Sequence, residues 1–400
     1  MGNTFFKALM ITATIFVTFA NADNGSPIWS TSADGSITSM DTISDCSDPS
    51  NGGNDLVIGT SFDSLYLLEA KNGSGQNKIG EALWAYPLLS TVNIIKSVPD
   101  MNNDGRPDIA IGDQNGVVAL FSGGSGNLFW IFIANTATIL SLDYIPDVNG
   151  DGVSEIIAGA ENDTVYCLSG LVPDMWDPNP VPRETTPLWV FSTKAKVVAK
   201  RAVSYGLGEG HKRVTGVNSV VAIYNNDTIY GIIAGTSSNT LYCLSVLAID
   251  GTPTVKWKYT TSGDIWNLKA FPDVNGDGIN EVLAAGGDDK GYLLSGNDGN
   301  LLWTKSVDSG ATVVDIIGDQ NGDAISDALI GDGSGKVYCV SGKATGENVS
   351  ALWTFSTGDD QTITAISHLK DVNEDSKDEC IFGSSNDSVY VVSYAGKKIW

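Results

Sequence analysis

The chain has 400 residues, of which 42% are hydrophobic and only 18% charged, with 45 glycines and a formal net charge of −24. This length can bury a large core, and the glycine content suits a β protein rich in turns. The negative charge argues against a nucleic-acid partner, because phosphate backbones are bound by basic patches.

Residues 1–22 have the pattern of a secretory signal peptide. Lys7 supplies a positive charge, residues 8–20 are apolar, and Ala20-Asn21-Ala22 matches a small-residue cleavage site. The apolar stretch is short for a membrane anchor, and no other segment approaches the apolar length of a spanning helix. We therefore predict a secreted, extracellular or periplasmic protein with no transmembrane segment after cleavage.

A tryptophan that follows one or two apolar residues recurs along the rest of the chain. Between these tryptophans the order is constant: an apolar run, an acidic loop, a short apolar strand ending in Gly, a polar turn, and a further strand. This order predicts four β-strands per unit. The tryptophans bound seven units, 29–84, 84–130, 130–189, 189–257, 257–303, 303–353 and 353–400.

Repeating units of about 40–50 residues with four strands are typical of propeller blades. We predict one all-β domain over residues 23–400, a seven-bladed β-propeller of four-stranded antiparallel blades whose tryptophans wedge between neighbouring blades. An eight-bladed ring with a partial blade is the less favoured alternative.

A nine-residue acidic string lies at the same place in five units. It reads DMNNDGRPD, DVNGDGVSE, DVNGDGINE, DQNGDAISD and DVNEDSKDE, starting at residues 100, 147, 273, 319 and 371. In the first unit only Asp55 keeps the closing place, and the fourth unit has no acidic string. The blade therefore does not depend on the string.

Carboxylate and amide oxygens at positions 1, 3, 5 and 9 of the string form a ligand set suited to calcium. A glycine at position 6 permits the positive φ that a tight loop needs, and its replacements Ala324 and Ser376 predict weaker binding in the last two copies. The EF-hand is excluded, because position 12 lacks its bidentate glutamate. Asp-Gly loops also form plain turns without metal, but five matched copies favour calcium. The predicted ligands are Asp100, Asn102, Asp104, Asp108, Asp147, Asn149, Asp151, Glu155, Asp273, Asn275, Asp277, Glu281, Asp319, Asn321, Asp323, Asp327, Asp371, Asn373, Asp375 and Glu379.

Five cysteines are an odd number for an exported chain. Three of them, Cys167, Cys243 and Cys339, share one place in their units, which predicts buried apolar side chains. Cys46 and Cys380 belong to the first and last units, which are neighbours in a closed ring, so a disulfide between them is a hypothesis.

With these motifs laid out, residues 27–400 resemble two propeller repeat families. The acidic loop followed by an apolar strand and Gly resembles the FG-GAP/VCBS repeat, known from integrin alpha-chain propellers and many secreted bacterial proteins. The segments VYCLSG and VYCVSGKATGENVSALW resemble the pyrroloquinoline-quinone-type repeat. The first resemblance implies the same calcium ligands. The second does not extend to the quinone cofactor, because the adjacent cysteines of those enzymes are missing.

Residues for catalysis are few. His211 and His368 lie in no recognisable motif. Trp176 and Trp266, outside the tryptophan register, are candidate contacts for a ligand. We expect a non-catalytic binding or adhesion scaffold for a protein or glycan partner, with calcium as its cofactor. The alternatives are a lyase or hydrolase acting on extracellular polysaccharide and a periplasmic or outer-membrane assembly scaffold of the quinone-repeat type.

Overall fold

The structure is a computed structural model. It describes residues 36–44, 46, 54–69, 82–172, 183–193, 216–226, 228–249, 252–371, 373–386 and 388–399, together with the strand backbone of 5–8, 15–20 and 27–33. Every regular element within these ranges is a β-strand, and none is a helix. Accordingly, no helix that could span a membrane occurs among the described residues.

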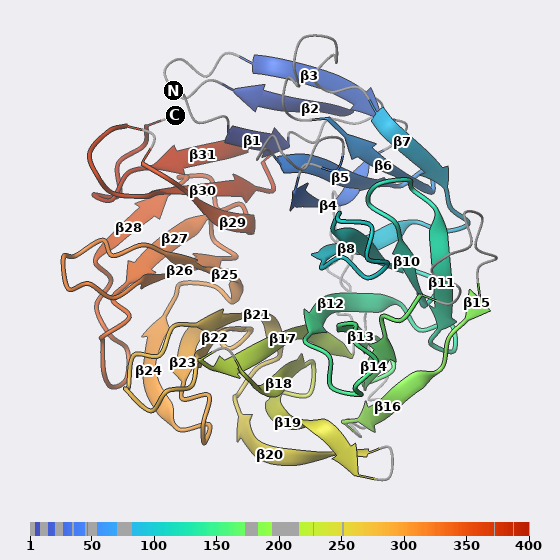
Figure 1. Cartoon of the computed structure of the whole chain (residues 1–400). Coiled ribbons are helices and arrows are strands. Elements are labelled where there is room, and N and C mark those ends of the chain that lie inside the picture. The colour runs from blue at the N-terminus through green and yellow to red at the C-terminus, as the bar shows by residue number, and fades with distance from the viewer. Residues whose placement is uncertain are drawn as a thin grey trace.

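Seven antiparallel sheets follow one another around a ring (Figure 1), so the predicted seven-bladed all-β propeller is confirmed. In each blade the chain runs from an inner strand to an outer strand. The first four blades are β4–β7 (Ile37–Ser44, Asn54–Thr60, Ser64–Leu68, Ala82–Pro87), β8–β11 (Val92–Val98, Asp108–Asp113, Val117–Phe121, Leu128–Ile133), β12, β13, β14 and β16 (Ile139–Ile145, Glu155–Ala160, Thr164–Ser169, Pro187–Ser192), and β17–β20 (Val217–Asn225, Thr228–Thr236, Thr240–Ile249, Thr252–Thr260). The last three are β21–β24 (Ile265–Phe271, Glu281–Gly286, Lys290–Leu294, Leu301–Ser306), β25–β28 (Ala311–Ile317, Asp327–Asp332, Lys336–Val340, Trp353–Ser356) and β29–β31 (Ile363–Leu369, Glu379–Ser384, Ser388–Val392).

The seventh blade obtains its fourth strand position from the C-terminal residues. Lys398 forms an antiparallel bridge with Val392, and the Ile399 N–H donates to the Val391 carbonyl at 2.8 Å. A further three-stranded sheet is made of β1 (Phe5–Ala8), β2 (Ile15–Ala20) and β3 (Pro27–Ala33). Figure 1 draws it at the top of the ring, between the seventh blade and the first. Two of its strands come from the predicted signal peptide, whose cleavage stays a prediction.

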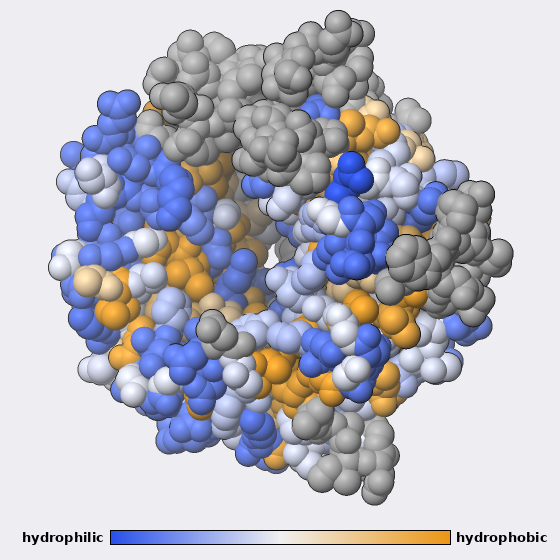
Figure 2. All heavy atoms as spheres, in the orientation of Figure 1, coloured by the Kyte–Doolittle hydropathy of each residue, from blue (hydrophilic) through white to orange (hydrophobic). Residues whose placement is uncertain are grey.

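The core lies between blades rather than within one of them. Middle strands such as β9, β13, β22 and β26 are buried at every position, because a neighbouring blade covers each face. Each hydrophobic cluster joins residues of two consecutive blades; one, for example, packs Leu120 and Trp130 against Ile156 and Leu168. Figure 2 shows a narrow opening at the centre of the ring and mostly hydrophilic residues on the outer rim of the last three blades.

The tryptophans of the outer strands dock onto the following blade, as predicted. Trp84 and Trp257 donate their indole N–H to the carbonyls of Gly123 and Gly296, at 2.9 and 2.8 Å. A Cβ added to Gly299 would lie 2.7 Å from the Trp257 ring, and the φ of Gly299 is +75°. Only glycine satisfies both conditions without strain. The glycine turns at Gly126, Gly299 and Gly396 therefore each receive the tryptophan ring of the preceding blade.

The inner strands have one edge that no strand covers, and side chains of neighbouring blades bond to it instead. Asn93, Asn218 and Thr312 hold the second position of their inner strands. Each donates to the carbonyl of the first residue of the next inner strand, at 2.8, 2.7 and 2.6 Å respectively. These bonds give carbonyls at the inner edge a hydrogen-bond partner in the neighbouring blade.

Charges at the fifth position of the inner strands tie further blades together. The Lys96 ammonium lies 3.0 Å from Asp143, and the Lys269 ammonium 3.2 Å from Asp315. Asp143 also accepts the Ala222 N–H of the following blade at 2.9 Å. Burial lowers the pKa of Lys96, but the Asp143 carboxylate outweighs it, so the pKa is raised. Asp143 thus joins three consecutive blades.

We expect Asp143→Ala to lower the free energy of unfolding by about 2 kcal/mol, because it leaves a backbone N–H and a lysine without their acceptor. Chemical denaturation measures this, with Glu347→Ala, an exposed residue, as the control. Equal, small losses in both variants would contradict the role of Asp143.

Two outer strands carry a short parallel partner supplied by the next blade. Arg183 of β15 (Arg183–Glu184) lies opposite Trp130 of β11, and Gly346 bridges Trp303 of β24. Both segments come from the turn between the third and fourth strands of the following blade. They cover part of an edge that is otherwise open to pairing with another chain.

Cys46 and Cys380 are both buried and are not joined by a disulfide, so the hypothesis of a disulfide between them is wrong. Cys46 packs in the core between the first two blades. Cys380 packs between the last two blades, in the same cluster as Cys339. Membership of the first and last blades therefore does not bring these two thiols together. The burial of Cys167, Cys243 and Cys339 is confirmed.

Candidate metal centres

Each acidic string joins the inner strand of its blade to the next strand, as the sequence predicted. Position 6 has a positive φ in all five loops, at Gly105, Gly152, Gly278, Ala324 and Ser376. Position 4 is also left-handed, which the sequence analysis missed. Its residues are Asn103, Gly150, Gly276, Gly322 and Glu374. The glycines at position 4 of three copies were the available signal.

The side chains at positions 1, 3 and 5 hold the loop closed by accepting its own N–H groups. In the second loop, Asp147 accepts from Gly152, Asn149 from Asp151, and Asp151 from Val153, all within 2.8–3.0 Å. The same three bonds recur in the other four loops. The loop can therefore hold its shape before any ion binds.

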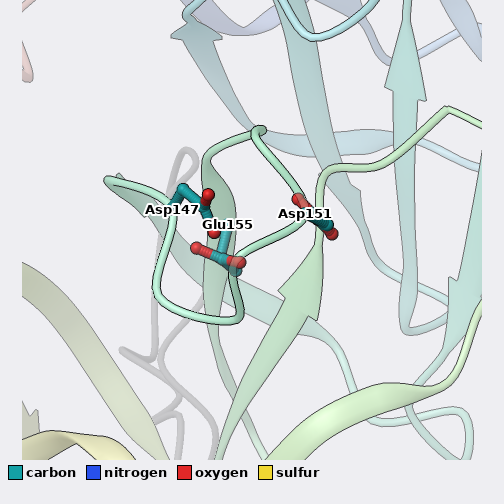
Figure 3. A group of neighbouring side chains, drawn as sticks. All are labelled: Asp147, Asp151 and Glu155. Atoms are coloured by element: carbon teal, nitrogen blue, oxygen red, sulfur yellow. The ribbon is translucent and has the colours of Figure 1, made fainter.

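Two loops bring three carboxylates to one point. In each, one oxygen from each group lies within 4.8 Å of the others: Asp147, Asp151 and Glu155 in one loop, and Asp371, Asp375 and Glu379 in the other. Figure 3 shows Asp147 and Glu155 facing each other in their loop, with Asp151 beside them. Because calcium binds oxygen at about 2.3–2.6 Å, two ligands of one ion lie at most about 5 Å apart. Both groups meet this limit, and no other acidic loop forms such a group among the described residues.

The closing carboxylate at position 9 distinguishes the second loop from three others. In three loops the carboxylate at position 9 accepts backbone N–H groups from its own loop and also from a glycine of the following turn. These carboxylates belong to Asp108, Glu281 and Asp327. Glu155 is also fully buried, and its Oε2 atom accepts from the Val148 N–H of its own loop at 3.0 Å. Its Oε1 atom is buried without a hydrogen-bond partner. A buried, unpartnered carboxylate oxygen beside two aspartates is suited to a cation.

Burial raises the pKa of these closing carboxyl groups, and the neighbouring aspartates raise it further. The values are about 8 for Asp108, about 7 for Glu155 and Glu281, and about 6 for Asp327. Backbone N–H donors lower the pKa of Asp147 instead. A divalent cation favours the ionised form of the carboxyl groups at positions 1 and 9. Because the pKa at position 9 is raised, binding of the cation would release protons from that position.

The residues present in the second and fifth loops fit calcium. Asp147, Asp151 and Glu155 would hold the ion in one, and Asp371, Asp375 and Glu379 in the other. The bound ion would supply positive charge that links the two ends of the loop. Chelation of this kind stiffens a surface loop but places no reactive group there.

The remaining candidate residues are dispersed. Trp266 is half-buried at the start of β21, and a Cβ on Gly287 or Gly310 would lie 2.9 Å from its ring. Its position is thus explained by packing, and its role in binding stays a prediction. His368 is exposed on β29. Trp176 and His211 lie outside the described residues.

Residues 184–399 match the family described as outer membrane protein assembly factor BamB. This match covers more than half of the chain. The chain belongs to this family. The resemblance to quinone-type propeller repeats is thereby confirmed, whereas the resemblance to FG-GAP/VCBS repeats stays a prediction. Among curated proteins, none matches this chain significantly.

Solved structures similar to this member of the family are also propellers. BamB from Moraxella catarrhalis has 14% identity and a TM-score of 0.58, with 96% of this chain and 95% of that chain covered. Saccharomyces cerevisiae Sqt1 has 11% identity and a TM-score of 0.69, covering 98% and 99%. Chaetomium thermophilum Sqt1, solved with the N-terminus of ribosomal protein L10, has 12% identity and a TM-score of 0.67, covering 96% and 92%. At these identities the likeness shows the fold alone.

Proposed function

We propose that this chain is an exported, non-catalytic scaffold that binds other proteins from a propeller stiffened by calcium. The observation that carries the proposal is the family match over residues 184–399, because the family is described as an assembly factor. The rigid ring supports it: every core cluster joins two blades, and side chains tie the inner strands together. Such a ring can present fixed surfaces to a partner.

Calcium is the second part of the proposal, and the loop of Asp147, Asp151 and Glu155 supports it best. Oxygens of three carboxylates converge there, and the Oε1 atom of Glu155 is buried without a hydrogen-bond partner. Filling this loop and its counterpart at 371–379 would reduce the net charge of −24 and link the three carboxylates of each loop through the ion. The loops at 100–108 and 273–281 would first have to release the N–H groups of Gly123 and Gly296.

Export is the third part, supported by the signal-peptide pattern of residues 1–22. Cleavage after Ala22 would remove β1 and β2 and leave β3 without its partner. N-terminal sequencing of the protein from its source tests this. A mature chain that starts at Asp23 or within a few residues of it is expected, and an intact Met1 terminus would contradict export by this route.

The scaffold itself is tested by purifying the tagged chain from its source after cross-linking, once with calcium and once with a chelator. We expect a small, reproducible set of proteins in near-stoichiometric amounts, retained best with calcium. The same preparation is incubated with a panel of extracellular polysaccharides. Release of shortened glycans, with no protein partner retained, would contradict the scaffold and favour the lyase or hydrolase alternative.

A further inference from the structure

The fourth acidic loop, residues 319–327, differs from the others in the side chain of the next blade that lies against it. In the loops of the third and fifth blades, an apolar residue at position 7 lies against the preceding blade. Val153 packs with Met101 in one hydrophobic cluster, and Ile279 bridges Asn225 of the blade before it. In the last blade position 7 is Lys377, so an ammonium group takes the place of an apolar side chain.

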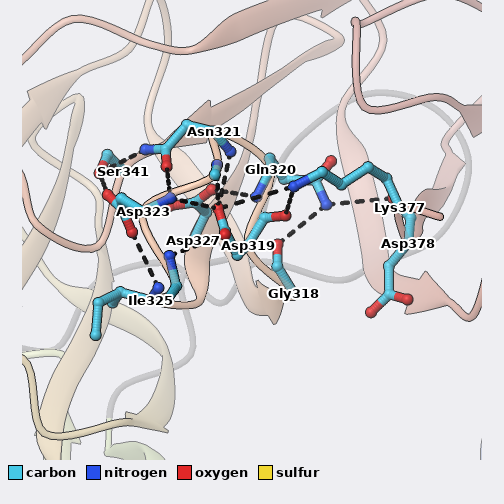
Figure 4. A network of polar contacts seen from close by, with 12 residues as sticks. Gly318, Asp319, Gln320, Asn321, Asp323, Ile325, Asp327, Ser341, Lys377 and Asp378 are labelled. Atoms are coloured by element: carbon cyan, nitrogen blue, oxygen red, sulfur yellow. Dashed lines mark hydrogen bonds and ion pairs between the residues drawn. The ribbon is translucent and has the colours of Figure 1, made fainter.

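This ammonium group contacts Asp319, the first predicted ligand residue of the fourth loop. Lys377 Nζ donates to the backbone carbonyl of Asp319 at 2.5 Å and lies 3.9 Å from its carboxylate Oδ1. Figure 4 shows the lysine reaching across from the seventh blade to this loop. Gln320 strengthens the junction by donating to the Asp378 carbonyl at 3.3 Å. Both members of the ion pair are half-buried, with 28% and 25% of their side chains exposed.

The rest of the loop is also less suited to a cation. Both oxygens of Asp327 accept backbone N–H groups, from Gln320 at 2.8 Å and from Gly342 at 3.1 Å. Lys343 brings a second ammonium, which donates to the Asp323 carbonyl at 2.9 Å. A calcium ion bound to Asp319 would lie within about 6.5 Å of the Lys377 ammonium, given Ca–O distances of 2.3–2.6 Å, and the like charges would repel.

We propose that Lys377 acts as a tethered cation for the loop at 319–327, which therefore excludes calcium although its sequence matches the other loops. The inference rests on the proposed calcium binding of the chain. It also assigns Lys377 a positioning role. Its ammonium joins the sixth and seventh blades, whereas a bound ion would stiffen only the loop that holds it.

The first test counts calcium ions by calorimetry on the metal-stripped full chain. Asp319→Asn should leave the number of bound ions unchanged, whereas Asp147→Asn should lower it by one. Lys377→Val, which installs the residue found at position 7 of the third blade, should add one ion that the further change Asp319→Asn removes. Lys370→Val is the matched control, because Lys370 pairs with Asp378 and does not contact the loop. Loss of one ion in Asp319→Asn alone would overturn the proposal.

The second test needs no calcium and so separates this inference from the proposed function. In excess chelator, Asp319→Asn should lower the melting temperature by about 2 °C, because it removes the partner of a tethered cation. Asp147→Asn should lower it by less, because both variants weaken the N–H bonds of their loop but only Asp319 also has an ammonium partner. Equal shifts in the two variants would overturn the role of Lys377 even if the wild-type chain bound no calcium.

Discussion

Trp303→Ala is expected to lower the free energy of unfolding by about 3–5 kcal/mol, one of the largest losses available to a single substitution. Trp303 lies on β24 with none of its surface exposed, in a cluster with Phe271, Leu293 and Val314 that joins the fifth and sixth blades. Removing the ring leaves a cavity between blades that are held in place by their neighbours, so the cavity cannot easily collapse.

Trp266→Ala is the matched comparison for this prediction. Its ring is half-buried and rests on Gly287 and Gly310 at the end of the inner strand. We expect a clearly smaller loss, near 1–2 kcal/mol. Denaturant unfolding of both variants under one set of conditions measures the difference. A loss for Trp303→Ala no greater than that for Trp266→Ala would contradict the view that the tryptophan register holds the blades together.

Burial raises the pKa of Glu155 to about 7, from an unfolded value near 4.5. In the metal-free chain the folded state then holds this proton more tightly than the unfolded state. Its contribution to stability is present at low pH and is lost as the pH rises from about 4.5 to about 7. Asp108, Glu281 and Asp327 act in the same direction.

Calcium binding at this loop should therefore release about half a proton at pH 7 and almost none at pH 9. Calorimetry in buffers of different ionisation enthalpy measures the release. In Glu155→Gln the proton release from this loop should vanish, and so should its calcium binding, while the metal-free stability becomes less dependent on pH. Proton release that is the same at pH 7 and pH 9 would contradict the assignment of Glu155 as a ligand.

The sequence predicted the blades well because their signals are local. Each unit of about 50 residues repeats a tryptophan, a turn that contains glycine and several short apolar runs. Each of these signals predicts a strand or a turn. The bonds from Asn93, Asn218 and Thr312 to the next blade span 46 to 51 residues. No local pattern distinguishes these polar residues from others on a strand, so the closure of the inner edge had to come from the structure.

The acidic loops were predicted as a class but not individually. The last loop has Ser376 in place of glycine, yet it adopts a φ of 68° and its carboxylates converge. The hydrogen bonds of Asp371, Asn373 and Asp375 hold that conformation, which offsets the strain of a Cβ. The string at 319–327 keeps every ligand residue, but Lys377 from another blade lies against it. The spacing of the ligand residues indicates which ion a loop could bind. It does not show which side chains of a neighbouring blade lie against that loop.

A calcium titration of the metal-stripped mature chain tests the central claim most directly. We expect heat from at least two ions per chain, lost in part with Asp147→Asn and in part with Asp371→Asn. The melting temperature should rise with calcium, since each site filled at one hundred times its Kd adds about 2.7 kcal/mol. Absence of heat together with an unchanged melting temperature would contradict a ring stiffened by calcium and leave the acidic loops as turns closed by their own hydrogen bonds.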